Sequence, residues 1–182
     1  MTMKTLRAVV AGPVSSGKST FVQTASETDL IETERLSTDS TSLLKPQTTV
    51  AFDFSRLILS PEMEIHIYGT PGQSRFDFMW DLLIKRADAY ILLVAAHRPD
   101  DLPSAREILV YMHQRVQLPM IVGITHTDCP NARSVAEIID ALDYLDKKKS
   151  PIVMTVNPMN KTSVLKVIIK LKSLILGEID GK

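Results

Sequence analysis

The chain has 182 residues, a hydrophobic content of 45%, and equal numbers of basic and acidic side chains, 21 of each. This length predicts a single domain over 1–182 with a substantial core, and the balanced charge does not favour nucleic acid or an anionic membrane surface. A single cysteine, Cys129, excludes an internal disulfide. Without a signal peptide, a lipidation motif or an apolar run that could span a bilayer, we expect a cytoplasmic protein.

Short β-rich runs alternate with helical stretches along the chain. This alternation predicts an α/β domain with a mostly parallel six-stranded sheet, one antiparallel strand and helices on both faces. Ligands of such sheets bind beyond the carboxyl ends of the strands. In the first half of the chain we expect a strand at 6–12, a helix from Lys18 to about Thr28, a long loop at 29–48, a hairpin of 49–59 and 63–69, and a helix at 73–86. In the second half we expect strands at 87–96, 118–125 and 151–157. Each of these strands is followed by a helix: from Pro103 to about Val116, from its cap at Ser134 to Tyr144, and from Thr162 to Leu176.

The clearest motif is GPVSSGKS, which matches G-x-x-x-x-G-K-[ST] between a predicted strand and a predicted helix. Backbone N–H groups of such a loop surround phosphate oxygens, and the helix N-terminus adds a favourable dipole. Lys18 would reach the β- and γ-phosphates, and Ser19 would offer a hydroxyl to Mg²⁺. The alternative is a chance glycine turn, which the strand–loop–helix context disfavours. The predicted phosphate contacts are Gly12, Val14, Ser15, Ser16, Gly17, Lys18, Ser19 and Thr20.

Four further segments follow this loop at predicted strand ends. They are Thr48-Thr49, the turn GTPGQ at 69–73, THTD at 125–128 and NPMN at 157–160. In this order and spacing the chain resembles the small Ras-like GTPases over nearly its whole length. The stretch TTVAFDF…YGTPGQSRFDFMWDLL is similar to bacterial GTPases related to the MglA gliding-motility protein and to the conservon GTPases. The resemblance implies a P-loop NTPase with a small G-domain, which binds GTP or GDP with Mg²⁺ and acts through protein partners.

The resemblance also assigns roles around the γ-phosphate. Thr49 would bind Mg²⁺ through its hydroxyl, with Thr48 as the competing candidate, although both could simply begin a strand. Gly72 would donate its N–H to the γ-phosphate. Gln73 would orient the attacking water and, with Lys18, is the predicted catalytic residue; the alternative for Gln73 is an exposed position in the first helical turn.

Two departures concern the phosphate end. Gly69 stands where the related GTPases have an aspartate that helps hold Mg²⁺, so either the metal binds more weakly or another carboxylate compensates. Asp53 in the hairpin is the candidate, but the sequence does not place it. Val14 stands where glycine is common, and a branched side chain there crowds the catalytic glutamine. We therefore expect slow hydrolysis, on the order of 10⁻⁴ per second.

Two more departures concern the base. THTD replaces N-K-x-D, but Asp128 is kept, and its carboxylate can accept two N–H groups that guanine offers and adenine does not. Thr125 would make a shorter contact than asparagine, and His126 would stack on the base or face solvent. Asn157-Pro158-Met159 replaces S-A-K, so that the N–H of Met159 is the remaining backbone donor, since proline has none. These changes predict a preference for guanine that is weaker than usual.

The segment 70–86 is the predicted partner surface. Phe76, Phe78, Met79 and Trp80 lie within five positions and cannot all face the core from one helix. The alternative places Phe76 and Trp80 in the core. In the wider group the partners include roadblock/longin-type proteins.

Three functions remain open at this point. The leading hypothesis is a regulatory GTPase that hydrolyses GTP slowly. The second is a degenerate G-domain that binds nucleotide weakly, or without hydrolysis, and serves as an interaction scaffold. The third, a small-molecule kinase, lacks an arginine-rich lid segment.

Overall fold

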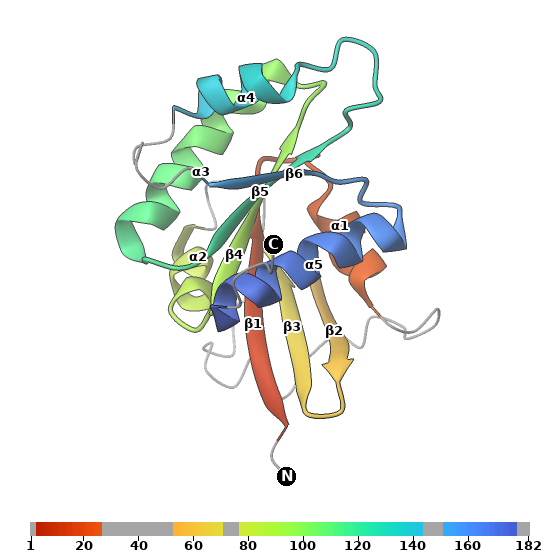
Figure 1. Cartoon of the computed structure of the whole chain (residues 1–182). Helices are drawn as coiled ribbons and strands as arrows, with labels where there is room; N and C mark the ends of the chain where they lie inside the picture. Colours follow the sequence, from red (N-terminus) through yellow and green to blue (C-terminus); the bar gives the residue numbers. More distant parts are fainter. Residues whose placement is uncertain (1–2, 27–52, 71–76, 144–150, 178–182) are drawn as a thin grey trace.

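The computed structural model describes residues 3–26, 53–70, 77–143 and 151–177 (Figure 1). Within these ranges six strands form one sheet in the order β2-β3-β1-β4-β5-β6. The β2–β3 pair is antiparallel, and the other four pairs are parallel. The predicted sheet, with its single antiparallel strand, is therefore confirmed. The strands are β1 (Lys4–Ala11), β2 (Asp53–Ser60), β3 (Met63–Gly69), β4 (Ala89–Ala95), β5 (Met120–Thr125) and β6 (Ile152–Thr155).

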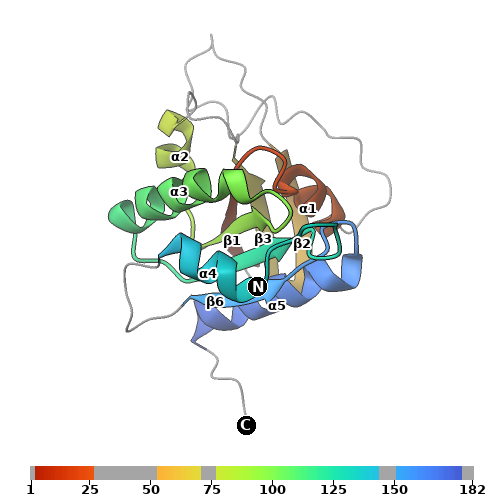
Figure 2. The same cartoon turned by 90° about the horizontal axis from the view of Figure 1, so that it is seen from above.

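Helices cover both faces of the sheet, as the two views in Figures 1 and 2 show. The helices α1 and α5 pack on one face, where they share a core cluster with β1, β3 and β4. The helices α3 and α4, with the end of α2, pack on the other face. The described helices are α1 (Lys18–Ala25), α2 (Asp77–Ile84), α3 (Leu102–Arg115), α4 (Val135–Leu142) and α5 (Lys161–Leu176), with a short 3₁₀ turn, η3 (Pro99–Asp101), before α3.

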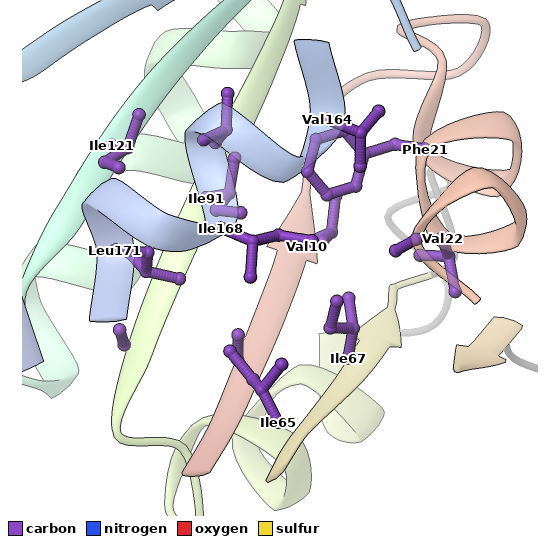
Figure 3. Close-up of a cluster of buried hydrophobic side chains, with 14 of the residues drawn as sticks. Val10, Phe21, Val22, Ile65, Ile67, Ile91, Ile121, Val164, Ile168 and Leu171 are labelled. Atoms are coloured by element: carbon purple, nitrogen blue, oxygen red, sulfur yellow. The ribbon is translucent and has the colours of Figure 1, made fainter. Parts of the chain in front are cut away.

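The alternation of side chains along β1 explains the two cores. Val10 points towards α1 and α5, where it lies among Phe21, Ile67 and Val164 (Figure 3). The next residue in the same strand, Ala11, belongs to the cluster on the opposite face. Successive residues of a strand point to opposite faces, so a central strand buried on both sides has a continuous apolar sequence. This is why the runs at 6–12, 87–96 and 118–125 could be recognised as central strands.

Helix ends differ slightly from the predictions, and the caps explain where they fall. The predicted capping box of α4 is present: the Ser134 hydroxyl accepts from the Glu137 N–H, and the Glu137 carboxylate accepts from the Ser134 N–H. The helix α4 ends at Leu142 because Asp143 adopts a left-handed conformation. The helix α1 ends at Ala25, three residues before its predicted end, because Ser26 is extended.

Several predictions fall outside the described residues. These are the loop at 29–48, the first residues of the hairpin up to 52, the start of the helix at 73–76 and the end of the helix at Tyr144. For the helices that are described, length and apolar composition fall short of what crossing a membrane requires.

Candidate functional site

The loop at 12–19 connects the carboxyl end of β1 to α1, at the edge of the sheet where ligands of parallel sheets bind. Two of its positions require glycine. Gly12 has a φ of 151°, and a Cβ there would lie 2.4 Å from the carbonyl oxygen of Leu93. Gly17 has a φ of 97°, and a Cβ there would lie 2.9 Å from Cγ of Pro158. The glycines of the motif therefore allow a tightly turned loop to pack against its neighbours.

The ammonium group of Lys18 lies over this loop. Its Nζ donates to the carbonyl oxygens of Gly12 at 2.8 Å and Pro13 at 2.5 Å. The side chain is buried, and burial lowers the pKa of Lys18 to about 8, although the charge of Asp53 acts in the opposite direction. A buried cation whose hydrogen-bond partners are neutral carbonyls is stabilised by any anion that enters the loop.

Asp53 occupies the space beside Gly69. The two residues are directly paired between β2 and β3. A Cβ at Gly69 would lie 3.2 Å from Cβ of Asp53 and 3.4 Å from its Oδ2. The same Oδ2 accepts a hydrogen bond of 2.5 Å from the hydroxyl of Ser19, the predicted metal ligand. A carboxylate is thus present at the position where the sequence motif lacks one, but it comes from the neighbouring strand.

The sequence named Asp53 without placing it, and the hairpin register contains the missing information. Met63 pairs with Ser60, and counting back along the antiparallel strands, across one bulge, sets Asp53 opposite Gly69. The pairing also puts Asp53 on the face of the sheet that carries α1, because Leu57 of the same strand lies in that core. The start of α1 carries Ser19, which brings the hydroxyl and the carboxylate together.

A serine hydroxyl beside one carboxylate suits Mg²⁺, which usually keeps several waters and takes few protein ligands. Within the described ranges there is no group of three or more His, Cys, Asp or Glu side chains that could hold a metal by themselves. The donor set therefore fits a metal that shares its coordination with water and a bound ligand.

The turn that follows Gly69 starts firmly attached to β1. The N–H of Thr70 donates to the carbonyl oxygen of Val10 at 2.9 Å, and its hydroxyl lies 3.3 Å from the same oxygen. The predicted residues Thr49, Gly72 and Gln73 lie outside the described residues, as does Thr48. Their roles stay predictions.

At the end of β5, Thr125 is bonded to the phosphate loop. Its side chain is fully buried, and its hydroxyl donates to the carbonyl oxygen of Ser16 at 2.9 Å. The hydroxyl oxygen also lies 2.8 Å from Nδ1 of His126. The sequence predicted that Thr125 contacts a base, whereas in the structure this hydroxyl ties β5 to the loop at 12–19.

His126 and Asp128 differ in their surroundings. His126 has a φ of 56° and its ring lies 4.6 Å from the ring of His97, at an interplanar angle of 41°. Burial and the neighbouring His97 lower the pKa of His126 below its ordinary 6.5, against the opposing charge of Asp128. Asp128 itself is exposed, so its carboxylate is accessible at the end of β5.

The segment 157–159 is held by its own hydrogen bonds. The N–H of Met159 donates to Oδ1 of Asn157 at 3.0 Å, and the N–H of Asn157 donates to the hydroxyl of Ser163 at 3.0 Å. Pro158 is buried against Gly17 of the phosphate loop. The backbone donor that the sequence assigned to a base therefore has a partner within this segment.

The described parts of the predicted segments, 12–19, 69–70, 125–128 and 157–160, lie at the carboxyl ends of β1, β3, β5 and β6. Thr125 and Pro158 contact the loop at 12–19 from other segments, and the side chain of its own Lys18 bonds to its carbonyl oxygens. Among the other predicted contacts on the loop and on α1, Gly12 and Ser16 are buried and Gly17 is half-buried. The exposed ones are Val14, Ser15, Ser19 and Thr20, with Val14 at 52% exposure.

Comparison with known proteins places this site in a wider context. A family described as "Conserved hypothetical ATP binding protein" matches residues 28–175, a range that begins after the phosphate loop. An uncharacterized protein of Methanocaldococcus jannaschii is 29% identical over 80 residues, which are 44% of this chain and 50% of that protein. The chain thus spans about half the length of this curated relative. The Arl6 BBS3 small GTPase from Trypanosoma brucei, solved with the nucleotide analogue GppNp, has 16% identity and a TM-score of 0.74, over 97% of this chain and 100% of that chain.

The structural match shows that the chain has the fold of a small GTPase, as the sequence predicted. The family match covers well over half of the chain, and the chain belongs to that family.

Proposed function

We propose that this member of the family of conserved hypothetical ATP binding proteins is a nucleotide-controlled switch that binds GTP with Mg²⁺, hydrolyses it slowly and acts on protein partners. The hydrogen bond from Ser19 to Asp53 carries this proposal, because it supplies the carboxylate whose absence from the turn at 69–73 had left the metal site incomplete. The phosphate loop and the buried Lys18 supply the binding site for the anionic end of the nucleotide.

In this proposal the hydroxyl of Ser19 and the carboxylate of Asp53, which comes from the first strand of the hairpin, would hold Mg²⁺. Thr49 would complete the protein ligands, as the resemblance to Ras-like GTPases implies. When bound, Mg²⁺ would neutralise negative charge on the phosphate oxygens. Lys18 exchanges its two loop carbonyls for phosphate oxygens and so stabilises their charge.

Hydrolysis is proposed to be slow and to depend on the turn at 69–73. Gly72 would donate its N–H to the γ-phosphate, and Gln73 would orient the attacking water. Thr70 anchors the start of this turn to β1, which fixes where the turn leaves the sheet. Val14 is exposed at the loop, where its branched side chain restricts the approach of a catalytic group. These features support a rate on the order of 10⁻⁴ per second without help from a partner.

The base is proposed to be guanine, although the family is described as ATP binding. Asp128 is exposed at the end of β5, and a carboxylate can accept both N–H donors of a guanine edge. Thr125 and Met159 have internal hydrogen-bond partners, which supports a preference weaker than that of a site with all its donors available. The His126 ring is proposed to lie along one face of the base.

Partners are proposed to bind the segment 70–86, which couples the γ-phosphate to the helix α2. Roadblock/longin-type proteins are the proposed class, and the proposed branch is that of the bacterial MglA-related and conservon GTPases. A second function is favoured by the internal bonds of Thr125 and Met159: an interaction scaffold with the same fold that binds nucleotide weakly and does not hydrolyse it. Phosphate release from bound GTP, stimulated by a partner, distinguishes the switch from the scaffold.

The carboxylate of Asp53 provides the direct test. Affinities for GTP, GDP and ATP are measured by calorimetry with Mg²⁺ and with EDTA, for the wild type and for Asp53→Asn. We expect Mg²⁺ to strengthen GTP binding in the wild type. In Asp53→Asn the ratio of GTP affinities with and without Mg²⁺ should be about tenfold smaller, which is equivalent to one charge-assisted hydrogen bond. The EDTA affinities should agree between the two proteins.

Glu62→Gln is the matched control, since Glu62 is an exposed carboxylate in the turn of the same hairpin. Gly69→Asp alone is a poor test, because a Cβ there would crowd both Asp53 and Val22. A wild type that binds no nucleotide at millimolar concentration would exclude both the switch and the scaffold. An equal response of GTP affinity to Mg²⁺ in Asp53→Asn and in the wild type would remove the carboxylate from the metal site.

A further inference from the structure

Two histidines that are far apart in the sequence meet at the base end of the site. His97 follows β4 and His126 follows β5. These strands are parallel neighbours, and Ala95 pairs with Thr125, so the chain leaves both strands at the same level. The two imidazole rings lie 4.6 Å apart between centroids and are tilted by 41°. This separation is within the range of aromatic pairs that stabilise each other by contact.

His126 is fixed on its other sides. Its backbone is left-handed, with a φ of 56°. Its Nδ1 lies 2.8 Å from the hydroxyl oxygen of Thr125, which in turn donates to Ser16 at 2.9 Å. Its Cε1 would lie 3.9 Å from a Cβ at Gly17. The ring of His126 therefore stands beside the loop and two residues before Asp128.

The hydrogen-bond chain determines which nitrogen of His126 is bonded. When the Thr125 hydroxyl donates to Ser16, its oxygen can accept only from an N–H, so Nδ1 carries the hydrogen. The neutral ring then has its lone pair on Nε2, away from Thr125. Thr125 thus fixes the edge of the ring that faces β5, but it does not support the ring face.

His97 supplies that support. Its Nδ1 is buried and has no hydrogen-bond partner within the described part of the chain. A buried histidine that serves a structural role usually bonds its ring nitrogens. The geometric contact that distinguishes His97 is instead its ring against His126.

We propose that His97 is a positioning residue for the nucleotide base: it supports the His126 ring so that the ring stands beside the loop as a platform on which a purine stacks. This rests on the proposed function and adds to it a residue outside the segments that the sequence singled out. Stacking on an aromatic ring tolerates any base, so the platform adds affinity for purine nucleotides, while selectivity between guanine and adenine depends on Asp128.

The test compares ligands with and without a base. Affinities for GDP and for inorganic tripolyphosphate are measured for the wild type, His97→Ala, His97→Phe and His126→Ala. We expect His97→Ala to weaken GDP binding roughly tenfold and to leave tripolyphosphate binding unchanged, because removing one stacking contact affects only the base. His97→Phe keeps a ring and should restore GDP binding. The double variant of His97→Ala and His126→Ala should be no weaker than His126→Ala alone, since both act through one ring.

An independent readout is the titration of His126, followed by NMR of its Cε1 proton. His97→Phe keeps the ring contact but removes the positive charge that opposes protonation, so the pKa of His126 should rise, with Asp128 as the other charged group acting on it. The dispersion of the backbone amide signals, recorded on the same samples and on the His126→Ala variants, shows whether each variant is folded.

The outcomes separate this inference from the proposed function. If His97→Ala keeps the GDP affinity of the wild type, while Lys18→Ala has lost it, the platform is wrong and the nucleotide site stands. Equal weakening of GDP and tripolyphosphate by His97→Ala would mean that His97 only maintains the loop, and would overturn the inference. A wild type that binds neither ligand would overturn both.

Discussion

The two ends of the site are built differently. At the phosphate end, charged groups lie at the loop at 12–19: the buried ammonium of Lys18 donates to carbonyl oxygens of the loop, and the carboxylate of Asp53 accepts from Ser19. At the base end, two neutral groups that a base would use are engaged within the protein, whereas the carboxylate of Asp128 is exposed. Thr125 donates to Ser16, and the N–H of Met159 donates to Asn157.

This difference indicates what each end contributes. A nucleotide that enters the phosphate end replaces neutral carbonyl partners of Lys18 with charged oxygens, which strengthens those hydrogen bonds. A base that enters the other end gains contacts mainly from Asp128 and from the face of His126, since the neutral donors of Thr125 and Met159 gain little when one neutral partner is exchanged for another. We therefore expect the phosphates to supply most of the affinity, and the base to supply modest selectivity.

The largest expected effect is at Lys18. Lys18→Ala should weaken GTP and ATP alike by about 100-fold or more, because it removes charge-assisted hydrogen bonds to two phosphates. Isothermal titration calorimetry measures both affinities. Lys166→Ala, which changes an exposed lysine on α5, should leave them unchanged. If the GTP affinity of Lys18→Ala equals that of the wild type, the loop at 12–19 is not the phosphate site.

The same contrast explains which parts could be predicted from the sequence. The phosphate loop could be recognised because its glycines are required by the backbone itself: Gly12 and Gly17 have positive φ values, and no Cβ fits at either position. The central strands could be recognised because burial on both faces leaves a continuous apolar run. These are local constraints, and they leave a local pattern.

The features that could not be predicted from the sequence depend on strand register and on which groups within the protein hydrogen-bond to one another. Asp53 supports the site only because the hairpin pairs it with Gly69, sixteen residues away in the chain. The hydroxyl of Thr125 donates to the carbonyl oxygen of Ser16, more than a hundred residues away in the chain. No motif at 125–128 indicates this hydrogen bond. The His97–His126 contact likewise follows from the pairing of β4 and β5, and a lone histidine after an apolar strand gives no signal of it.

The next largest effect is expected at Asp128, and it tests whether the base end distinguishes guanine from adenine. Asp128→Ala should reduce the preference for GTP over ATP by about tenfold to a hundredfold, the range expected for hydrogen bonds to a charged acceptor. The affinity for ATP should change little, since adenine lacks the donor pair. Competition of GTP and ATP for a fluorescent GDP analogue measures the ratio, with Asp140→Ala on α4 as the control. A wild type without preference would show that Asp128 does not read the base.

Thr125→Val tests whether Thr125 stabilises the loop at 12–19 or contacts the base. The substitution keeps the shape of the side chain but leaves the carbonyl of Ser16 and Nδ1 of His126 without the hydroxyl, so stability should fall by about 1–3 kcal/mol. GTP and ATP should weaken by the same factor, because the loop at 12–19 serves both. Thr127→Val, at an exposed position nearby, should cost no more than about 0.5 kcal/mol in urea unfolding. A loss confined to GTP would instead assign Thr125 to the base.

The smallest effect is the pH dependence of the base end. Because the pKa of His126 is lowered in the folded protein, the unfolded chain binds this proton more readily. Stability should therefore be unaffected by this group above its ordinary pKa of 6.5, and should fall as the pH decreases from 6.5 through the lowered folded value. Asn tolerates the left-handed backbone of this position and does not titrate, so His126→Asn should have a shallower loss of stability below pH 6.5. Urea unfolding of both proteins across this range measures the difference, and parallel pH profiles would mean that burial and the neighbouring His97 do not lower the pKa of His126.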